Sequence, residues 1–217
     1  MIQTVIFDLD GVIIDSEPVH FRLEKQMLNE LQITVSSEEH NSYVGMSSEN
    51  MWETIVNKHN LSYQPSELVQ RKHTLYIDHL INEKNLHPIH GVAELIKELY
   101  ENNFKLIIAS SSPSEVIDAV LKKFNLSSYF IATVSGTQLV HSKPHPEIFL
   151  QAANLANSKT EECVVIEDSQ NGVAAAKAAG MKCIGFANPN SGNQNLSKAD
   201  LVIKSFEEIN VGLIRNL

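Results

Sequence analysis

The chain has 217 residues, which is enough for one α/β domain with a modest insertion and too few for two large domains. Hydrophobic residues make up 43% and charged residues 20%, an ordinary composition for a protein that buries a core. The net charge of −9, with no lysine or arginine block and no run of membrane-spanning length, argues against nucleic acid or a membrane as the main partner.

The first predicted element is a buried strand over residues 4–8, followed by a long segment of a different kind. Residues 17–86 show helical patterns and no convincing strand, and this segment is too long for a loop within one sheet. We therefore predict an all-helical cap domain, residues 16–87, inserted into a core domain formed by residues 1–15 and 88–217. The cap should have three apolar stripes: Phe21, Met27, Leu28 and Leu31; Met51, Trp52, Ile55 and Val56; and Leu68, Leu75, Tyr76 and Leu80.

After the insertion, short apolar runs alternate with amphipathic segments. Continuous apolar runs are typical of parallel strands that are covered on both faces. The alternation predicts a doubly wound parallel α/β sheet, a Rossmann-like core. Strands are predicted over residues 105–109, 163–166 and 182–186 and, more weakly, over 131–134 and 201–203; helices are predicted over 92–99 and 116–124 and from about Val173 to Gly180.

The two cysteines favour a reducing compartment. Cys163 and Cys183 lie in or beside predicted strands and have no metal-ligand or redox spacing, so we expect reduced thiols in the core. The run from Val5 to Phe7 is cut short by Asp8 and does not resemble a targeting segment. We therefore expect a cytoplasmic protein, and nothing in the sequence requires more than a monomer.

Acidic residues follow two of the predicted strands. Asp8 and Asp10 are two residues apart, so on an extended chain they lie on the same side, at the edge where parallel sheets bind ligands. Glu167 and Asp168 end a second strand. Carboxylates held this close repel one another, and Mg²⁺ is a cation that suits such oxygens. An acidic turn or helix start explains either pair alone, but it does not explain their pairing in one sheet.

Two further segments carry groups that suit an anion. Ser110, Ser111 and Ser112 end a predicted strand just before a helix, where hydroxyls and backbone N–H groups can hold a phosphate oxygen. Lys143 stands between a turn and Pro144 and can act as a fixed positive charge. Ordinary helix capping by serine and a solvated lysine are the alternatives for each segment taken alone.

Together the four segments resemble the motifs of the haloacid dehalogenase superfamily. The order is Asp8-Leu-Asp10-Gly, Ser110, Lys143-Pro and Glu167-Asp168, and the resemblance covers essentially the whole chain, including the cap. It is closest to the branch of β-phosphoglucomutase and small sugar-phosphate phosphatases. The stretches typical of that branch are Asp15-Ser16-Glu17-Pro18, Gly45-Met46-Ser47 and Lys143-Pro-His-Pro-Glu-Ile-Phe149.

This resemblance implies a role for each motif residue. Asp8 would be the nucleophile that becomes phosphorylated, and Asp10 would be the general acid and then the general base. Ser110, Ser111 and Lys143 would hold the transferring phosphoryl group. The implied ligands of Mg²⁺ are Asp8, Asp10 through its carbonyl, Glu167 and Asp168. In the cap, His20, Gly45 and Ser47 are the candidate substrate contacts.

The sequence leaves the reaction within this family open. Asp10 and Asp168 argue against carbon–halogen cleavage, because the dehalogenases lack the second aspartate and need no metal. A mutase needs cations in the cap for a second phosphate, and the sequence from Val44 to Ser48 has none. We therefore favour a phosphatase acting on small phosphorylated metabolites, sugar phosphates above all. A β-phosphoglucomutase-type mutase and a non-catalytic binding protein are the alternatives.

Two other features are interpreted as unrelated to function. His141 and His145 have the i, i+4 spacing of zinc ligands on a helix, but Pro144 between them argues against a helix there. The segment around residues 188–192 contains Asn, Gly and Ser and indicates a mobile loop rather than a site.

Overall fold

The computed structural model describes residues 1–36, 39, 43 and 48–217. Two units are distinct within it: Met1–Glu17 together with Asn85–Leu217, and Pro18–Lys84. The first unit carries the sheet and the second, which we call the cap, is helical. Gly45 and Ser47, which the sequence assigns to substrate contact, lie outside the described residues.

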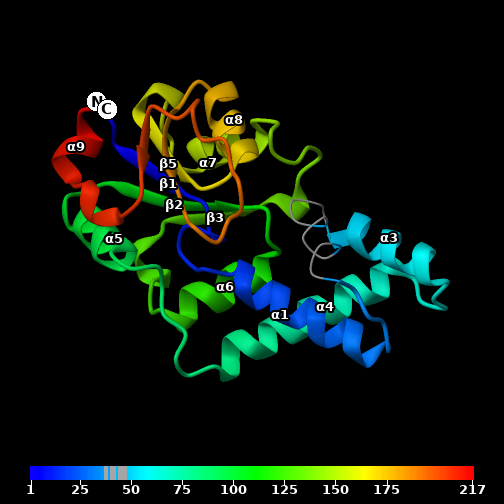
Figure 1. The fold of residues 1–217 in the computed structure, drawn as a ribbon. Coiled ribbons are helices and arrows are strands. Elements are labelled where there is room, and N and C mark those ends of the chain that lie inside the picture. Colours follow the sequence, from blue (N-terminus) through cyan, green and yellow to red (C-terminus); the bar gives the residue numbers. More distant parts are fainter. Residues whose placement is uncertain (37–38, 40–42, 44–47) are drawn as a thin grey trace. The chain divides into compact units, whose positions relative to one another are not determined.

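The sheet has six parallel strands in the order β3-β2-β1-β4-β5-β6 (Figure 1). This order confirms the doubly wound sheet, because the chain builds outward from β1 on one side and then returns to build outward from it on the other. In the central strand, Ile6 is aligned with Ile107 of β2 and Val165 of β4. The strands are β1 (Thr4–Phe7), β2 (Lys105–Ser110), β3 (Ala132–Ser135), β4 (Cys163–Glu167), β5 (Lys182–Phe186) and β6 (Leu201–Ile203).

Helices cover both faces of the sheet (Figure 1). α7 (Glu147–Leu155) and α8 (Gln170–Ala178) lie on one face, where Phe149 and Val173 pack with Ile6, Ile107 and Val165 in a buried cluster. On the other face lie α5 (Val92–Glu101) and α6 (Ser114–Lys123). The remaining helices of this unit are α9 (Val211–Arg215) and the 3₁₀ turns Ser127–Tyr129, Gly136–Gln138, Thr160–Glu162 and Phe206–Glu208.

The shared direction of the strands decides where polar residues meet. β1, β2 and β4 are neighbours, so the residues at their carboxyl ends meet at one edge of the sheet. These residues are Asp8, Ser110 and Glu167. Chain order reverses between β1 and β4, and such a point opens a crevice for ligands at the carboxyl edge.

The cap has its own hydrophobic core. It contains α1 (Glu17–Glu30), which begins at the border of the unit, α3 (Ser48–His59) and α4 (Pro65–Asn82). Its buried cluster consists of Met27, Leu28, Ile33, Tyr43, Met51, Trp52, Ile55 and Leu68. The assignment of Phe21 to the first stripe was wrong, because its side chain is 40% exposed. Val19, Leu23 and Met27, spaced by four residues, form the buried face instead, and Phe21 is half a turn away from them.

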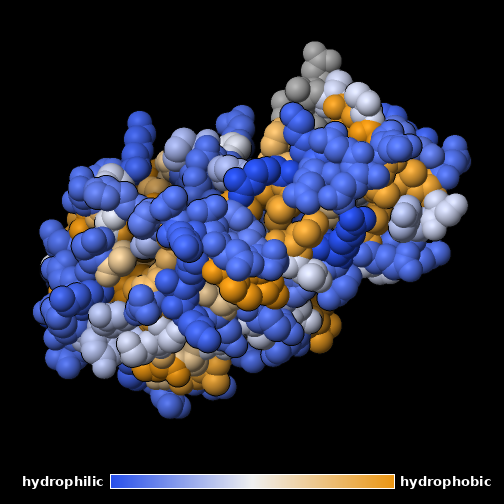
Figure 2. Space-filling model, turned by 90° about the horizontal axis from the view of Figure 1, so that it is seen from below, coloured by the Kyte–Doolittle hydropathy of each residue, from blue (hydrophilic) through white to orange (hydrophobic). Residues whose placement is uncertain are grey.

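The face shown in Figure 2 is mainly hydrophilic. On this face, hydrophobic residues emerge only in patches between hydrophilic ones. Within the described part of the chain, no helix combines the length and the apolar character that a membrane span requires. Cys163 and Cys183 are both buried and free, as expected for core thiols.

Candidate active site

Asp8 is held at the carboxyl end of β1 by backbone and side-chain contacts. Its backbone N–H continues the sheet pairing with a 3.0 Å bond to the carbonyl of Ile166. Its carboxylate is almost fully buried, and Oδ1 accepts a 2.8 Å bond from Lys143 Nζ. One oxygen is therefore fixed by a cation at the edge where open α/β sheets bind ligands.

Lys143 links two of the acidic residues. Its Nζ donates to Asp8 Oδ1 and, at 2.7 Å, to Glu167 Oε1, and it lies 5.1 Å from the centre of the Phe149 ring. Burial alone lowers the pKa of Lys143, but the attraction of Asp8 and Glu167 outweighs this and raises the pKa. The side chain therefore stays charged, and it neutralises part of the carboxylate cluster.

Three buried carboxylates converge beside this lysine. Single oxygens of Asp8, Glu167 and Asp168 lie within 4.8 Å of one another. Burial, with the charge of Glu167 added, raises the pKa of Asp8 to about 7 and that of Asp168 to about 8. Three carboxylates face one ammonium, so the cluster lacks positive charge when all are ionised. A hard divalent cation with oxygen ligands fits this donor set.

Glycine is needed on both sides of the cluster. A Cβ atom at Gly11 would lie 1.9 Å from Asp168 Oδ2, and one at Gly172 would lie 1.7 Å from Glu167 Oε1. Neither distance is possible, so the glycines allow the backbone to approach the carboxylates closely. Glu167 is also held by Ser169, whose N–H and Oγ both donate to Oε2 at 2.7 and 2.9 Å.

The carboxylate of Asp10 has different surroundings. Oδ2 accepts a 2.6 Å bond from Ser112 Oγ and a longer one, 3.4 Å, from Ser110 Oγ. Oδ1 is buried and has no hydrogen-bond partner among the described residues. Among the described residues, the cluster of three carboxylates does not include Asp10. The free oxygen can accept or deliver a proton, and the carbonyl of Asp10 stays a predicted metal ligand.

The serine segment lies where the sequence predicts it, at the end of β2. Ser110 is buried, and its Oγ accepts a 3.0 Å bond from the N–H of Ser112. Ser111 and Lys143 both line a cavity of about 130 Å³. The structure thus brings a hydroxyl, a cation and the acidic cluster to one edge of the sheet.

Sequence reasoning missed a loop that contacts this edge. The interpretation of residues 188–192 as unrelated to the site was wrong, because Ser191 Oγ donates to Asp168 Oδ2. Asn188 Nδ2 donates to the carbonyl of Gly11 at 3.0 Å, and Asn190 Nδ2 donates to Asp15 at 2.5 Å. The sequence could have indicated this contact through the position of the loop, because the loop follows β5 and so begins at the same edge of the sheet.

In the cap, a cation contacts Ser48, the first described residue after residues 44–47. Lys72 of α4 donates to Ser48 Oγ at 2.9 Å and to Glu24 at 2.7 Å, and its side chain is 13% exposed. The local sequence of residues 44–48 could not show it, because Lys72 is 24 residues away. His20 of α1 lies against Tyr76, with ring centres 4.3 Å apart.

Comparison with known proteins gives consistent matches. Residues 5–186 match the family described as haloacid dehalogenase-like hydrolase. Beta-phosphoglucomutase of Bacillus subtilis is 30% identical over 98% of this chain and 93% of its own. Hexitol phosphatase B of Escherichia coli is 32% identical over 96% of this chain and 94% of its own. The relatives therefore include a mutase and a phosphatase.

Two further matches extend this picture. Protein SUPPRESSOR OF QUENCHING 1 of Arabidopsis thaliana is 32% identical over 84% of this chain, which spans only 18% of that protein. The crystal structure of beta-phosphoglucomutase from Clostridium difficile has a TM-score of 0.81 and 27% identity, and the match covers 100% of this chain and 96% of that one.

Proposed function

The chain belongs to the haloacid dehalogenase-like hydrolase family, and we propose that it is a phosphatase that uses Mg²⁺ and an aspartyl-phosphate on Asp8 to hydrolyse small phosphorylated metabolites of the sugar-phosphate class. One observation carries this proposal. The carboxylate of Asp8 lies at the carboxyl edge of the sheet, 2.8 Å from Lys143, within a group of three buried carboxylates. Asp8, the proposed nucleophile, therefore lies beside the ammonium of Lys143 and within a carboxylate cluster that suits a metal cation.

The first half of the reaction transfers the phosphoryl group to Asp8. A carboxylate oxygen of Asp8 attacks phosphorus, and the bond from phosphorus to the substrate's leaving oxygen breaks. Asp10 delivers a proton to that oxygen, so the leaving group departs as an alcohol. Its side chain suits this role, because Oδ1 is not engaged by any described residue while Ser112 fixes Oδ2.

The second half releases phosphate. Asp10, now ionised, takes a proton from water as the water oxygen attacks phosphorus, and the bond to Asp8 breaks. Lys143 and Ser110 hold the phosphoryl oxygens through both halves, since positioning and charge neutralisation are the main demands of this chemistry. Asp8, Glu167, Asp168 and the Asp10 carbonyl would hold Mg²⁺, which would supply positive charge that reduces repulsion between the Asp8 carboxylate and the phosphate.

A sugar-phosphate mutase is a second candidate, favoured by Lys72. The sequence argued against a mutase because the cap segment has no adjacent cation, yet Lys72 Nζ lies 2.9 Å from Ser48 Oγ. A largely buried lysine beside a hydroxyl can hold a second phosphate. Its 2.7 Å ion pair with Glu24 offsets that charge, which is why we prefer the phosphatase.

A time course separates the two candidates. The purified chain is incubated with Mg²⁺ and a panel of phosphorylated sugars, including β-glucose 1-phosphate with a trace of the 1,6-bisphosphate. Free phosphate and glucose 6-phosphate are both followed. We expect phosphate from several substrates and little isomer. Glucose 6-phosphate formed much faster than phosphate would replace the phosphatase by the mutase, and no magnesium-dependent turnover of any substrate would exclude both.

A further inference from the structure

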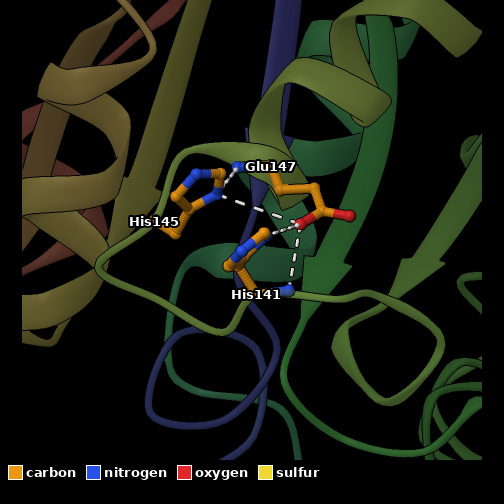
Figure 3. Close-up of side chains that lie close together, drawn as sticks. All are labelled: His141, His145 and Glu147. Carbon is orange, nitrogen blue, oxygen red and sulfur yellow. Dashed lines mark hydrogen bonds and ion pairs between the residues drawn. The ribbon is translucent and has the colours of Figure 1, made fainter.

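Two histidines and a glutamate converge outside the acidic cluster. His141 and His145 lie in the loop before α7, and Glu147 is the first residue of that helix. One donor atom from each residue lies within 4.8 Å of the others. Figure 3 shows both imidazole rings and the carboxylate directed toward one another. The sequence argument against metal binding was that Pro144 prevents a helix, and it does not hold, because the bent loop brings the side chains together without one.

The separations suit a small metal ion. Glu147 Oε2 lies 2.9 Å from His141 Nδ1 and 3.9 Å from His145 Nδ1. Tetrahedral zinc with bonds of about 2.0–2.1 Å places its ligand atoms about 3.3 Å apart. These two distances lie on both sides of this value, and all three ligand atoms lie within 4.8 Å of one another, so side-chain movement without refolding of the loop would complete the site. Two hydrogen bonds would be replaced: the 2.9 Å bond between His141 Nδ1 and Glu147 Oε2, and the 3.3 Å bond from the Glu147 N–H to His145 Nδ1.

The carboxylate is already held in place. Glu147 Oε1 accepts a 3.3 Å bond from the N–H of Val140, and Oε2 accepts a 3.0 Å bond from the N–H of His141. The two imidazole rings stack with centres 4.3 Å apart. The ligands therefore need little ordering when an ion binds. The site is half exposed, with His141 and His145 at 57% and 49%, so an ion can enter from solvent and keep water as a further ligand.

The neighbouring lysine does not prevent binding. Lys143 stands between the two histidines in sequence, but its Nζ donates to Asp8 and Glu167, and those carboxylates balance its charge. His141 and Lys143 also line the cavity of about 130 Å³, which leaves room for water on an ion. The loop can therefore hold a metal through its histidines while its lysine stays in the acidic cluster.

We propose that His141, His145 and Glu147 bind one divalent transition-metal ion of the zinc type, separately from the magnesium site. Two imidazoles and one carboxylate favour Zn²⁺, Ni²⁺ or Cu²⁺, whereas Mg²⁺ prefers oxygen ligands. The site belongs to the loop that carries Lys143, so an ion bound there would restrain that loop. This inference does not rest on the proposed phosphatase activity.

Zinc titration of the full chain by calorimetry, in excess Mg²⁺, tests the proposal. The excess Mg²⁺ is added to fill the proposed magnesium site in the acidic cluster, so the remaining Zn²⁺ binding should have a stoichiometry of one. Loss of a residue that merely supports a metal ligand costs roughly 10- to 100-fold in affinity, so His145→Asn should weaken Zn²⁺ binding at least tenfold. The double variant His141→Asn/His145→Asn should abolish this binding.

The matched control is another exposed histidine–glutamate pair. His90 Nε2 lies 3.1 Å from Glu207 Oε1. This pair resembles His141 and Glu147, but among the described residues it does not belong to a group of three possible metal ligands. His90→Asn therefore removes a histidine–glutamate pair without removing the proposed site. It should leave Zn²⁺ binding unchanged. Melting curves without metal show whether each variant is folded. X-ray absorption of the zinc-loaded wild type, which needs no variant, should show two imidazole ligands.

Three results would overturn the proposal. The first is equal Zn²⁺ affinity for the wild type and a folded double variant. The second is an absorption spectrum in which only oxygen atoms surround the zinc, because the ion would then be in the acidic cluster. An absence of Zn²⁺ binding to the magnesium-saturated wild type would also contradict it.

Discussion

At the scale of single residues, Asp10 combines a fixed oxygen with an open one. Ser112 Oγ holds Oδ2 at 2.6 Å, and Oδ1 is buried without a partner among the described residues. We expect Asp10→Asn to reduce steady-state hydrolysis of a sugar phosphate about 100- to 10,000-fold, the range for loss of a general acid or base. Measured steady-state rates check this loss.

The same variant separates the two roles of Asp10. p-Nitrophenyl phosphate has a leaving group that needs little protonation, so Asp10→Asn should release about one p-nitrophenol per enzyme in a burst and then turn over slowly. Ser112→Ala, which keeps the carboxylate, should lose much less activity. A variant that hydrolyses both substrates at the wild-type rate would remove Asp10 from the mechanism.

The raised pKa values of Asp8 and Asp168 predict how Mg²⁺ and pH combine. Burial raises these values to about 7 and about 8, whereas unfolded carboxyl groups titrate near about 4. Folding of the metal-free protein therefore takes up protons in this window, and its stability falls as pH rises through about 4 to 8. Mg²⁺ competes with those protons, so it should raise the melting temperature more at about pH 8 than at about pH 6.

Melting curves with EDTA or with MgCl₂ at both pH values check this linkage. Asp168→Asn should show a smaller magnesium effect, because it removes a proposed ligand and a titrating group. A magnesium-induced shift that is the same at both pH values would mean that the acidic cluster is not where Mg²⁺ binds.

At the scale of elements, the start of α8 must leave room for Glu167. Helix propensity alone predicts that Gly172→Ala stabilises the protein by up to about 1 kcal/mol. The added Cβ would lie 1.7 Å from Glu167 Oε1, so we expect the clash to win and to lower the free energy of unfolding by roughly 1–3 kcal/mol. Activity should fall as well, because Glu167 would move away from Lys143.

Gly212→Ala in α9 is the matched control. A new Cβ at Gly212 would have its nearest contact, Asn210 Oδ1, at 3.3 Å. Gly212 is also distant in sequence from the acidic motifs. Denaturant unfolding and phosphatase assays of both variants provide the comparison. Equal stability and activity of Gly172→Ala and wild type would show that Glu167 is not confined as described.

The elements also show what the sequence could predict. Continuous apolar runs located all six strands, and two of them, Lys182–Phe186 and Leu201–Ile203, have the predicted bounds. The other strand ends differ by a residue or so. For example, Ser110 still pairs with Ser135 in the sheet, and backbone pairing leaves no trace in side-chain hydrophobicity. The predicted fold and the family resemblance are both confirmed.

Contacts between distant segments could not be predicted from local patterns. Lys72 reaches Ser48 from another helix, and Ser191 reaches Asp168 from the loop after β5. His141 and His145 meet Glu147 in a bent loop, where helical spacing gives no guidance. Each of these contacts depends on where the chain turns, which periodicity does not encode.

At the scale of the whole molecule, the residues proposed for chemistry and those proposed for selectivity belong to different units. Asp8, Lys143 and Asp168 are in the sheet unit, and Lys72 is in the cap. If Lys72 holds a second phosphate, as the mutase alternative requires, Lys72→Met should lower kcat/KM for sugar bisphosphates more than for p-nitrophenyl phosphate, because only the bisphosphates present a second phosphate. Kinetics over a substrate panel measure this ratio.

Arg71→Met is the control for a general charge effect. Arg71 is the neighbouring cation on α4, its side chain is 45% exposed, and it pairs with Glu30. Arg71→Met should change kcat/KM by the same factor for all substrates. If Lys72→Met also changes all substrates alike, Lys72 has no part in selection and the support for a mutase disappears.

The most direct test of the central claim compares wild type with Asp8→Asn. Magnesium-dependent phosphate release from a sugar phosphate is measured for both proteins, with Asp118→Asn, an exposed residue of α6, as control. We predict that Asp8→Asn stays folded and loses roughly 10,000-fold or more in rate, as expected for removal of a nucleophile, while the control retains the wild-type rate. Equal phosphate release by wild type and Asp8→Asn would contradict an aspartyl-phosphate on Asp8.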